Sequence, residues 1–260
     1  DYRLFPVGPE VLGGLVAWPA SEAPKVLDLY RTLAETAPPE LTLVALMRPA
    51  PPAPWLPRAM HGKPIVALLA CHSGDPEAGQ KAVAPIKSFG APIGDVLVRR
   101  PYAQMQSLLD ATQPKGRRYY WKSEYLPRIE PALCVKAIEH AARIRSPYSA
   151  VILFQIGGAL NQLKEEHSPV GNRDAHYVLN IAGSWEREDD DRANIEWARE
   201  AWNDMKRFST GGTYINFLTE DEGPERVRAA LGRGLTRLAD VKAKWDPGNA
   251  FRTNRNIRPG

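Results

Sequence analysis

The sequence predicts an α+β fold, with helices packed on one face of an antiparallel sheet. Patterns typical of strands and helices alternate over residues 13–98 in the order strand, helix, strand, strand, helix, strand. This is the order of the ferredoxin-like, or split βαβ, arrangement, which places both helices on one face of the sheet. A hydrophobic fraction of 43% over 260 residues is ordinary for one large domain or two small ones.

Helix starts and loops delimit the elements of the first half. Ser21 is expected to cap the first helix and Asp75 the second, and a proline follows each of them in the first helical turn. Apolar residues recur at helical spacing behind both caps. Five prolines between Pro49 and Pro57 predict a loop. The predicted strands cover residues 13–18, 41–47, 65–71 and 93–98.

The second half continues the alternation, without a repeat of fixed period. An acidic run from Glu188 to Asp191 suits the positive end of a helix dipole, and we interpret it as a solvated helix start in preference to a metal site. A polar loop, residues 164–174, separates two strong strands. The predicted helices cover residues 101–111, 130–144, 190–208 and 235–244. The predicted strands cover residues 117–125, 148–156 and 176–185.

The last sixteen residues, 245–260, are the most distinctive part of the chain. A lysine-rich helix runs into a Trp-Asp-Pro-Gly-Asn turn, where Pro247 ends the helix and Gly248 and Asn249 tolerate left-handed backbone. An aromatic residue, arginines and asparagines follow in a pattern too regular for a frayed tail. We therefore expect this segment to bind a partner.

Composition argues against several classes of function. The net charge is only +4, and no Lys/Arg block is long enough to indicate nucleic-acid binding. Without a run of about 18 apolar residues we expect no membrane partner, and we expect a cytoplasmic location. Cys71 and Cys134 lie in apolar segments without metal-like spacing, so we interpret them as buried reduced thiols. The histidines also lack ligand spacing, and no motif predicts a hydrolase nucleophile.

Two C-terminal motifs resemble the FAD-linked oxidases of the berberine bridge enzyme type. The first is Tyr-x-Asn at Tyr214 and Asn216, and the second is the Lys-x-Lys-Trp-Asp-Pro-x-Asn-x-Phe-Arg pattern that runs from Lys242 to Arg252. Segments farther upstream are similar to the bacterial branch of that family. These segments are Tyr2 to Pro9, Gln106 to Asp110 and Tyr119 to Ser123. The likeness covers essentially the whole chain and is most specific at its end.

The resemblance implies a two-part enzyme. An N-terminal domain would hold FAD, a substrate domain would cover the flavin ring, and the chain would then return to the flavin domain. Residues 1–210 would be the substrate-binding α+β domain of such an oxidase, and residues 211–260 the returning segment. The first residue is Asp1 and not Met, and a strand-like segment, Tyr2 to Val7, begins at once, as after cleavage or in a fragment of a longer protein; we expect a fragment whose FAD domain is absent. Neither the histidine nor the cysteine to which the family attaches flavin can be assigned here.

The same resemblance implies candidate site residues. Tyr214 would be a catalytic base, and Asn216, two positions along a strand, would share its face and contact the cofactor. A free phenol titrates near pH 10, so this role requires a cationic neighbour or a second tyrosine. Packing and hydrogen bonding alone are the alternative for both residues. Asn249 would contact the cofactor, or would simply stabilise its own turn.

An aromatic strand and a strand end supply the candidate substrate contacts. Tyr119 and Trp121 alternate with Tyr120 and Lys122, so that one pair faces a substrate cavity, although such strands also build cores. Gln155 precedes two glycines at a strand end, where a ligand could approach closely or the chain could simply turn.

The function implied by the resemblance is that of an FAD-dependent oxidoreductase fragment. The full-length enzyme would oxidise an alcohol or similar C–H donor of small size by hydride transfer to flavin. The isolated 260-residue chain is expected to be inactive and to bind no FAD tightly. The alternative is a stand-alone ferredoxin-like module that binds a ligand or protein without catalysis.

Overall fold

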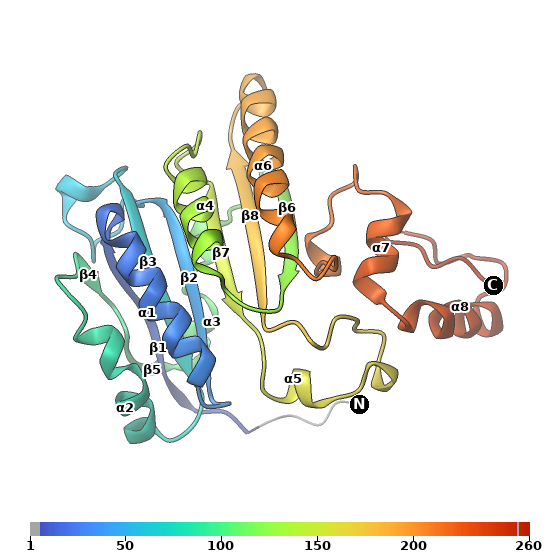
Figure 1. The fold of residues 1–260 in the computed structure, drawn as a ribbon, viewed down its shortest axis with the longest axis horizontal. Helices are drawn as coiled ribbons and strands as arrows, with labels where there is room; N and C mark the ends of the chain where they lie inside the picture. Colours follow the sequence, from blue (N-terminus) through green and yellow to red (C-terminus); the bar gives the residue numbers. More distant parts are fainter. Residues whose placement is uncertain (1–5, 254) are drawn as a thin grey trace.

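The protein is built on one antiparallel sheet, seen in a computed structural model that describes residues 6–253 and 255–260 (Figure 1). The strand order is β4-β1-β3-β2-β7-β8-β6, and β5 pairs with β1. The strands are β1 (Glu10–Pro19), β2 (Leu41–Pro49), β3 (Pro64–His72), β4 (Gly94–Asp95), β5 (Val98–Pro101), β6 (Arg118–Leu126), β7 (Ala150–Gln155) and β8 (Tyr177–Trp185). The predicted strand residues Tyr2 to Phe5, and Asn254 of the C-terminal segment, lie outside the described residues.

The first unit has the predicted ferredoxin-like order, β4-β1-β3-β2, with every pair antiparallel. Its fourth strand is broken into β4 and β5, where one continuous strand was predicted. Gly14 of β1 explains the break, because a Cβ there would lie 2.0 Å from the carbonyl oxygen of Val96. The chain between β4 and β5 therefore presses on the glycine backbone and bends away from regular pairing.

The second unit repeats this topology without a repeat in sequence. β6, helix α4 (Pro131–Ala141), β7, β8 and helix α6 (Asp191–Met205) follow one another, and β8 lies between β6 and β7 as β3 lies between β1 and β2. The segment after α6 takes the place of the fourth strand, beside β6. There the amide of Tyr125 donates to Gly212 O and that of Thr210 donates to Tyr125 O.

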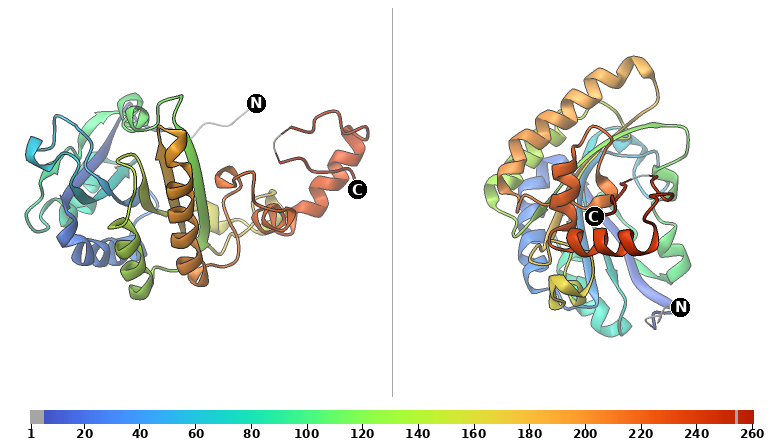
Figure 2. Two further views of the ribbon diagram at one scale, coloured as in Figure 1. Left: turned by 90° about the horizontal axis from the view of Figure 1, so that it is seen from above. Right: turned by 90° about the vertical axis from the view of Figure 1, so that its right-hand side faces the viewer.

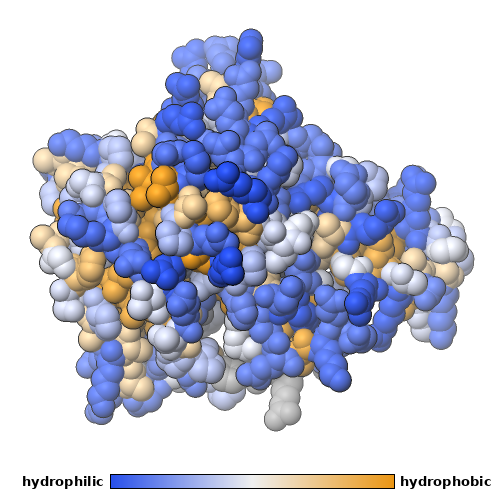
Figure 3. All heavy atoms as spheres, in the orientation of Figure 1, coloured by the Kyte–Doolittle hydropathy of each residue, from blue (hydrophilic) through white to orange (hydrophobic). Residues whose placement is uncertain are grey.

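One face of the sheet carries the main helices (Figures 1 and 2). These are α1 (Ala23–Thr36), α2 (Pro76–Lys87), α4 and α6. They pack with the sheet into one core that includes Trp18, Tyr30 and Leu153. The outer surface of this layer is mostly hydrophilic in Figure 3, as expected for amphipathic helices. Among the described residues, the opposite, open face of the sheet carries only the short helix α3 (Tyr102–Gln106) and loops.

The predicted helix starts have different outcomes. Asp75 caps α2 as predicted, because its Oδ1 accepts a hydrogen bond of 2.8 Å from Ala78 N. The prediction for Ser21 is wrong. Residues 20–22 form a 3₁₀ turn, and α1 begins at Ala23 with no side-chain cap. The amide of Ala23 already donates to Ala20 O within that turn, so this donor does not require a serine cap.

The C-terminal part forms an arm beyond the β6 edge of the sheet (Figure 2). It contains the turn η7 (Ile215–Phe217) and helices α7 (Pro224–Leu231) and α8 (Gly234–Trp245). The predicted helix 101–111 is shorter than expected, since only α3 and a 3₁₀ turn at residues 110–112 form. A further short helix, α5 (Ala159–Gln162), directly precedes the predicted polar loop 164–174. Within the described residues no helix has the length and apolar character to cross a membrane.

Candidate functional site

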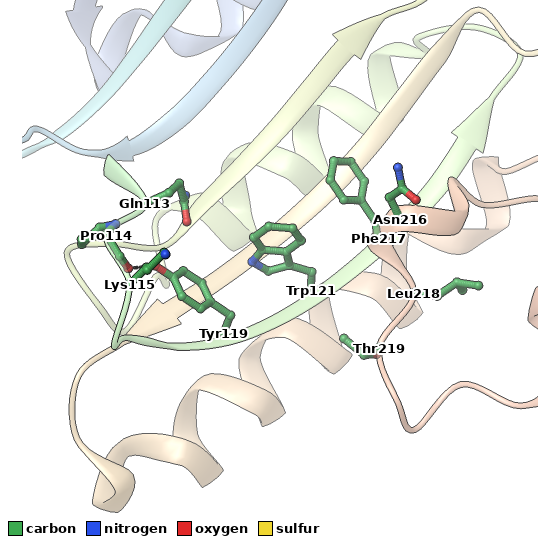
Figure 4. A pocket seen from close by; sticks show the side chains of 9 residues that line it. All are labelled: Gln113, Pro114, Lys115, Tyr119, Trp121, Asn216, Phe217, Leu218 and Thr219. Atoms are coloured by element: carbon green, nitrogen blue, oxygen red, sulfur yellow. Dashed lines mark hydrogen bonds between the residues drawn. The ribbon is translucent and has the colours of Figure 1, made fainter. Parts of the chain in front are cut away.

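A cavity of about 410 Å³ lies on the open face of the sheet, where strand β6 meets the arm (Figure 4). Its size falls within the range of small-molecule pockets, about 300 to 1,000 Å³. The lining comes from the loop before β6, from β6 itself and from η7. The residues are Gln113, Pro114, Lys115, Tyr119, Trp121, Asn216, Phe217, Leu218 and Thr219.

Strand β6 divides its side chains between the two faces as predicted. Tyr119 and Trp121 line the cavity, while Tyr120 and Lys122 are buried on the helix side with 9% and 3% exposure. Alternation along the strand causes this division. The phenol of Tyr119 donates to Pro114 O over 2.6 Å, which fixes the loop that forms one wall of the cavity (Figure 4).

Five aromatic rings form a connected cluster at the cavity, those of Tyr119, Trp121, Phe154, Tyr214 and Phe217. Phe217 contacts Trp121 and Tyr214 edge to face, with ring centroids 5.4 and 5.1 Å apart, and Tyr119 contacts Trp121 at 6.0 Å. Such pairs contribute about 0.5 to 1.5 kcal/mol each beyond burial. Phe217 was not among the predicted residues. The only signal for Phe217 in the sequence was that an aromatic residue follows Asn216 directly.

Tyr214 and Asn216 are neighbours, although the strand predicted for them is wrong. Residues 215–217 form a 3₁₀ turn, in which Phe217 N donates to Tyr214 O over 2.9 Å. The turn brings the two side chains together, and Asn216 Nδ2 donates to Tyr214 Oη over 2.8 Å. Because Oη acts as an acceptor there, the phenol proton of Tyr214 stays available to another group.

The segment that carries these residues, 213–222, is held to β6 at both ends. At its start the buried Thr213 hydroxyl lies 2.6 Å from Ser123 Oγ. At its end Lys122 Nζ lies 3.1 Å from Asp221 Oδ1 and 3.3 Å from Glu222 Oε1. The aromatic turn beside the cavity is therefore anchored to β6 on both its N-terminal and its C-terminal side.

Asp221 is the centre of several hydrogen bonds. Burial alone would raise the pKa of its carboxyl, but hydrogen bonds outweigh burial and hold the pKa well below its ordinary value. The donors to this carboxylate are Thr219, Tyr120, Arg199 and Lys122. The carboxylate thus stays ionised and keeps the buried Lys122 paired.

A second tyrosine, Tyr125, interacts with Tyr214. Burial mainly, and then a charge on Tyr214, raises the pKa of Tyr125 to about 12. Tyr125 therefore stays a neutral phenol at physiological pH, and the base role of Tyr214 stays a prediction. Within the described residues, the hydrogen-bond partner of the Tyr214 hydroxyl is the amide of Asn216 and not a cationic side chain.

Three buried polar groups on the open face have no partner within the described residues. These groups are Trp121 Nε1, in the cavity wall, and Asn180 Nδ2, whose residue is 3% exposed; the hydroxyl of Ser184, opposite Tyr119, is the third. Asn180 pairs across the sheet with Ser123 and Ile152, so it shares their face. Buried donors without acceptors are costly and indicate a missing hydrogen-bonding group. The sequence analysis did not single out Asn180. Its only signal was that it is a polar residue within the otherwise apolar strand β8.

Two other predicted residues lie away from this cavity. Gln155 accepts from Leu43 N at 3.0 Å and donates to Ala34 O at 3.1 Å, so its amide joins β2 and α1 to β7. Its role in binding substrate stays a prediction. Asn249 lies in the turn after α8 and is not part of the cavity wall.

The C-terminal turn has the predicted backbone. Asn249 has a φ of 52°, which is left-handed, and its buried Oδ1 has no partner within the described part of the chain. Asp246 organises the turn by accepting from Ala250 N at 2.7 Å and Phe251 N at 3.0 Å. Farther along, Arg255 returns to the cavity rim and donates to Leu218 O and Thr219 O, each over 2.6 Å. Sequence reasoning did not single out Arg255.

Comparison with known proteins identifies relatives of this chain. Residues 213–258 match the family model described as berberine and berberine like. An FAD-linked oxidoreductase of Dictyostelium discoideum is 24% identical over 75% of this chain and 42% of its own length. Aclacinomycin oxidase of Streptomyces galilaeus is 27% identical over 46% of this chain and 25% of its own length. The chain thus spans less than half of these relatives.

Solved structures share the fold at low sequence identity. A variant of berberine bridge enzyme, titled a reticuline dehydrogenase, matches 99% of this chain with a TM-score of 0.80 at 16% identity. The 6-hydroxy-D-nicotine oxidase of Arthrobacter nicotinovorans matches 99% with a TM-score of 0.76 at 20% identity. The chain covers 57% of each. These matches show that the chain shares the fold of berberine bridge enzyme and its relatives, and that residues 213–258 resemble the berberine and berberine-like family, whose curated relatives include FAD-linked oxidoreductases.

Proposed function

We propose that this chain is the substrate-side part of an FAD-dependent oxidoreductase that oxidises an alcohol or a similar C–H donor. The observation that carries the proposal is the aromatic cavity on the open sheet face, with Asn216 and Phe217 in its wall and Tyr214 in contact with both. Curated relatives are FAD-linked oxidoreductases, and the names of several solved neighbours state oxidation reactions.

The residues of the open face fit a planar heteroaromatic cofactor. Trp121 and Phe217 offer apolar ring surface, while Asn180 Nδ2 and Trp121 Nε1 are buried donors in need of acceptors. The carbonyl groups of a flavin ring are acceptors of that kind. When bound, FAD would supply the hydride acceptor of the reaction.

Oxidation of an alcohol to a carbonyl releases a hydride and a proton, and the second needs a base. We assign that role to Tyr214 in its ionised, phenolate form, whose Oη would take the substrate hydroxyl proton and become a neutral phenol while Asn216 Nδ2 donates to the same oxygen. The aromatic walls at Tyr119 and Trp121 would bind the flat apolar body of a small substrate and exclude water. Asn216 and Asn249 are proposed cofactor contacts.

The C-terminal segment, residues 211–260, is proposed to dock on the FAD domain, the partner that holds most of the cofactor. Large apolar rings on its surface support this, since Trp245 is 75% and Phe251 is 84% exposed. The unpartnered Oδ1 of Asn249 lies in the same turn. Residues 1–210 then form the substrate-binding domain.

The test uses the protein that contains both this chain and its flavin domain. Stopped-flow measurement of flavin bleaching should show that Tyr214→Phe slows reduction by about 10²- to 10⁴-fold, the usual contribution of a general base. Tyr102→Phe, at a tyrosine of similar exposure on α3, is the control and should keep the wild-type rate. An unchanged rate in Tyr214→Phe excludes the base role. Separately, stoichiometric FAD on the purified 260-residue chain would contradict the proposal that the FAD domain holds most of the cofactor.

A further inference from the structure

A second cavity, of about 530 Å³, lies on the open face at the β1, β2 and β3 side of the sheet. Strands supply Leu15, Leu46 and Ile65, and the proline-rich loop supplies Trp55. It shares no lining residue with the aromatic cavity. The loop before β6 separates the two cavities, because Leu108, Leu109, Ala111 and Thr112 line this one and residues 113–115 line the other.

Two guanidinium groups interrupt the apolar lining. Arg48 is only 9% exposed, and its nitrogens donate to the carbonyls of Pro49 and Pro147, each over 3.2 Å. Arg117 stacks on the ring of Tyr148, with its Cζ 3.4 Å from the ring centroid. No aspartate or glutamate lines the cavity within the described residues. One carboxylate, that of Glu186, pairs with Arg117 at 3.9 Å from its Nε, and this glutamate side chain is 60% exposed.

The buried positive charge is therefore not balanced from within. Two arginines face a single solvent-exposed carboxylate, and Arg48 has only neutral carbonyl partners. Burial, and then the charge of Arg117, lowers the pKa of Arg48. Charges buried to this extent are ordinarily paired. A bound anion would provide the pair, and the guanidinium group is the side chain best suited to a carboxylate.

We propose that this cavity binds an organic carboxylate with a flat apolar body, the carboxylate at Arg48 and Arg117 and the body against Leu46, Trp55 and Ile65. The volume admits a ligand the size of one or two fused rings. The proposal is independent of the flavin chemistry proposed above, because it uses neither Tyr214 nor the aromatic cavity.

Calorimetric titration of the 260-residue chain with 2-naphthoate and with neutral 2-naphthamide tests the proposal. Charge-assisted hydrogen bonds should make the naphthoate Kd at least about tenfold lower. Arg48→Met should remove that preference. Arg99→Met, on exposed β5, loses the same formal charge and should keep it, since Arg99 pairs with Glu10 at the surface.

A second variant protects the test against misfolding. Arg117→Met should reduce the preference as well, and circular dichroism establishes whether each variant is folded. Equal affinity for the two ligands, binding of neither, or an unchanged preference in the folded arginine variants would overturn the proposal. Failure of the flavin experiment would leave this result unaffected.

Discussion

Lys122→Met is the sharpest test of how the arm is attached to the sheet. The lysine side chain is 4% exposed and approaches Glu222, itself 5% exposed, to 3.3 Å. It also donates to Thr219 Oγ1 and Asp221 Oδ1, each over 3.1 Å. Methionine keeps most of the side-chain volume but removes the charge and all three donors, so the variant takes from the buried Glu222 carboxylate one of its two cations.

The expected cost follows from burial. Removing one partner of a buried ion pair costs about 3 to 5 kcal/mol, because the other charge remains desolvated. Arg226 Nε still lies 2.8 Å from Glu222, and Asp221 is partly exposed, so we expect the lower end, about 3 kcal/mol. That is a large share of the roughly 5 to 15 kcal/mol that stabilises a typical domain.

Urea unfolding followed by circular dichroism measures the change. With an m value of about 3 kcal/mol/M, the midpoint should fall by about 1 M. Lys136→Met removes an exposed pair with Glu139 and should change stability by no more than about 0.5 kcal/mol. Adding Glu222→Gln to Lys122→Met should recover part of the loss. A loss below about 1 kcal/mol in Lys122→Met would refute the reasoning.

Three further changes probe other contacts. Gln155→Leu leaves Leu43 N and Ala34 O unpaired and should cost about 1 to 3 kcal/mol in urea unfolding. Asp221→Asn should lower stability at neutral pH. Because the folded pKa of Asp221 is depressed, its contribution is present above about pH 4 and disappears in more acid solution, so the Asn variant and wild type should converge there. Asp246→Ala frees two turn amides, and their hydrogen exchange should accelerate while that of β8 does not change.

Local patterns predicted most of the sheet and helix order. Alternation correctly placed Tyr119 and Trp121 on the cavity side of β6, because side chains of a strand must point to opposite faces. The same rule failed at Tyr214 and Asn216. There the segment stands where a fourth strand would pair with β6, but after Thr213 it leaves the sheet edge and turns. A pattern of two residues cannot distinguish a strand from a 3₁₀ turn.

Other site residues depended on contacts between distant segments. Lys122 meets Asp221 and Glu222 across about a hundred positions, and Arg255 reaches Leu218 from the end of the chain. No local spacing encodes such pairs. The two topologically related units likewise have no common sequence period, since topology constrains only which positions are apolar.

The sequence by itself determined the fold class, the resemblance to FAD-linked oxidases and the aromatic face of β6, because periodicity and contiguous motifs are local properties of a chain. Only the tertiary structure decided what surrounds those residues. It showed Phe217 on Trp121, Asn216 on Tyr214 Oη, and two buried arginines facing an apolar cavity. These arrangements depend on how the sheet, the loop before β6 and the arm pack together, and packing is set by the whole chain at once.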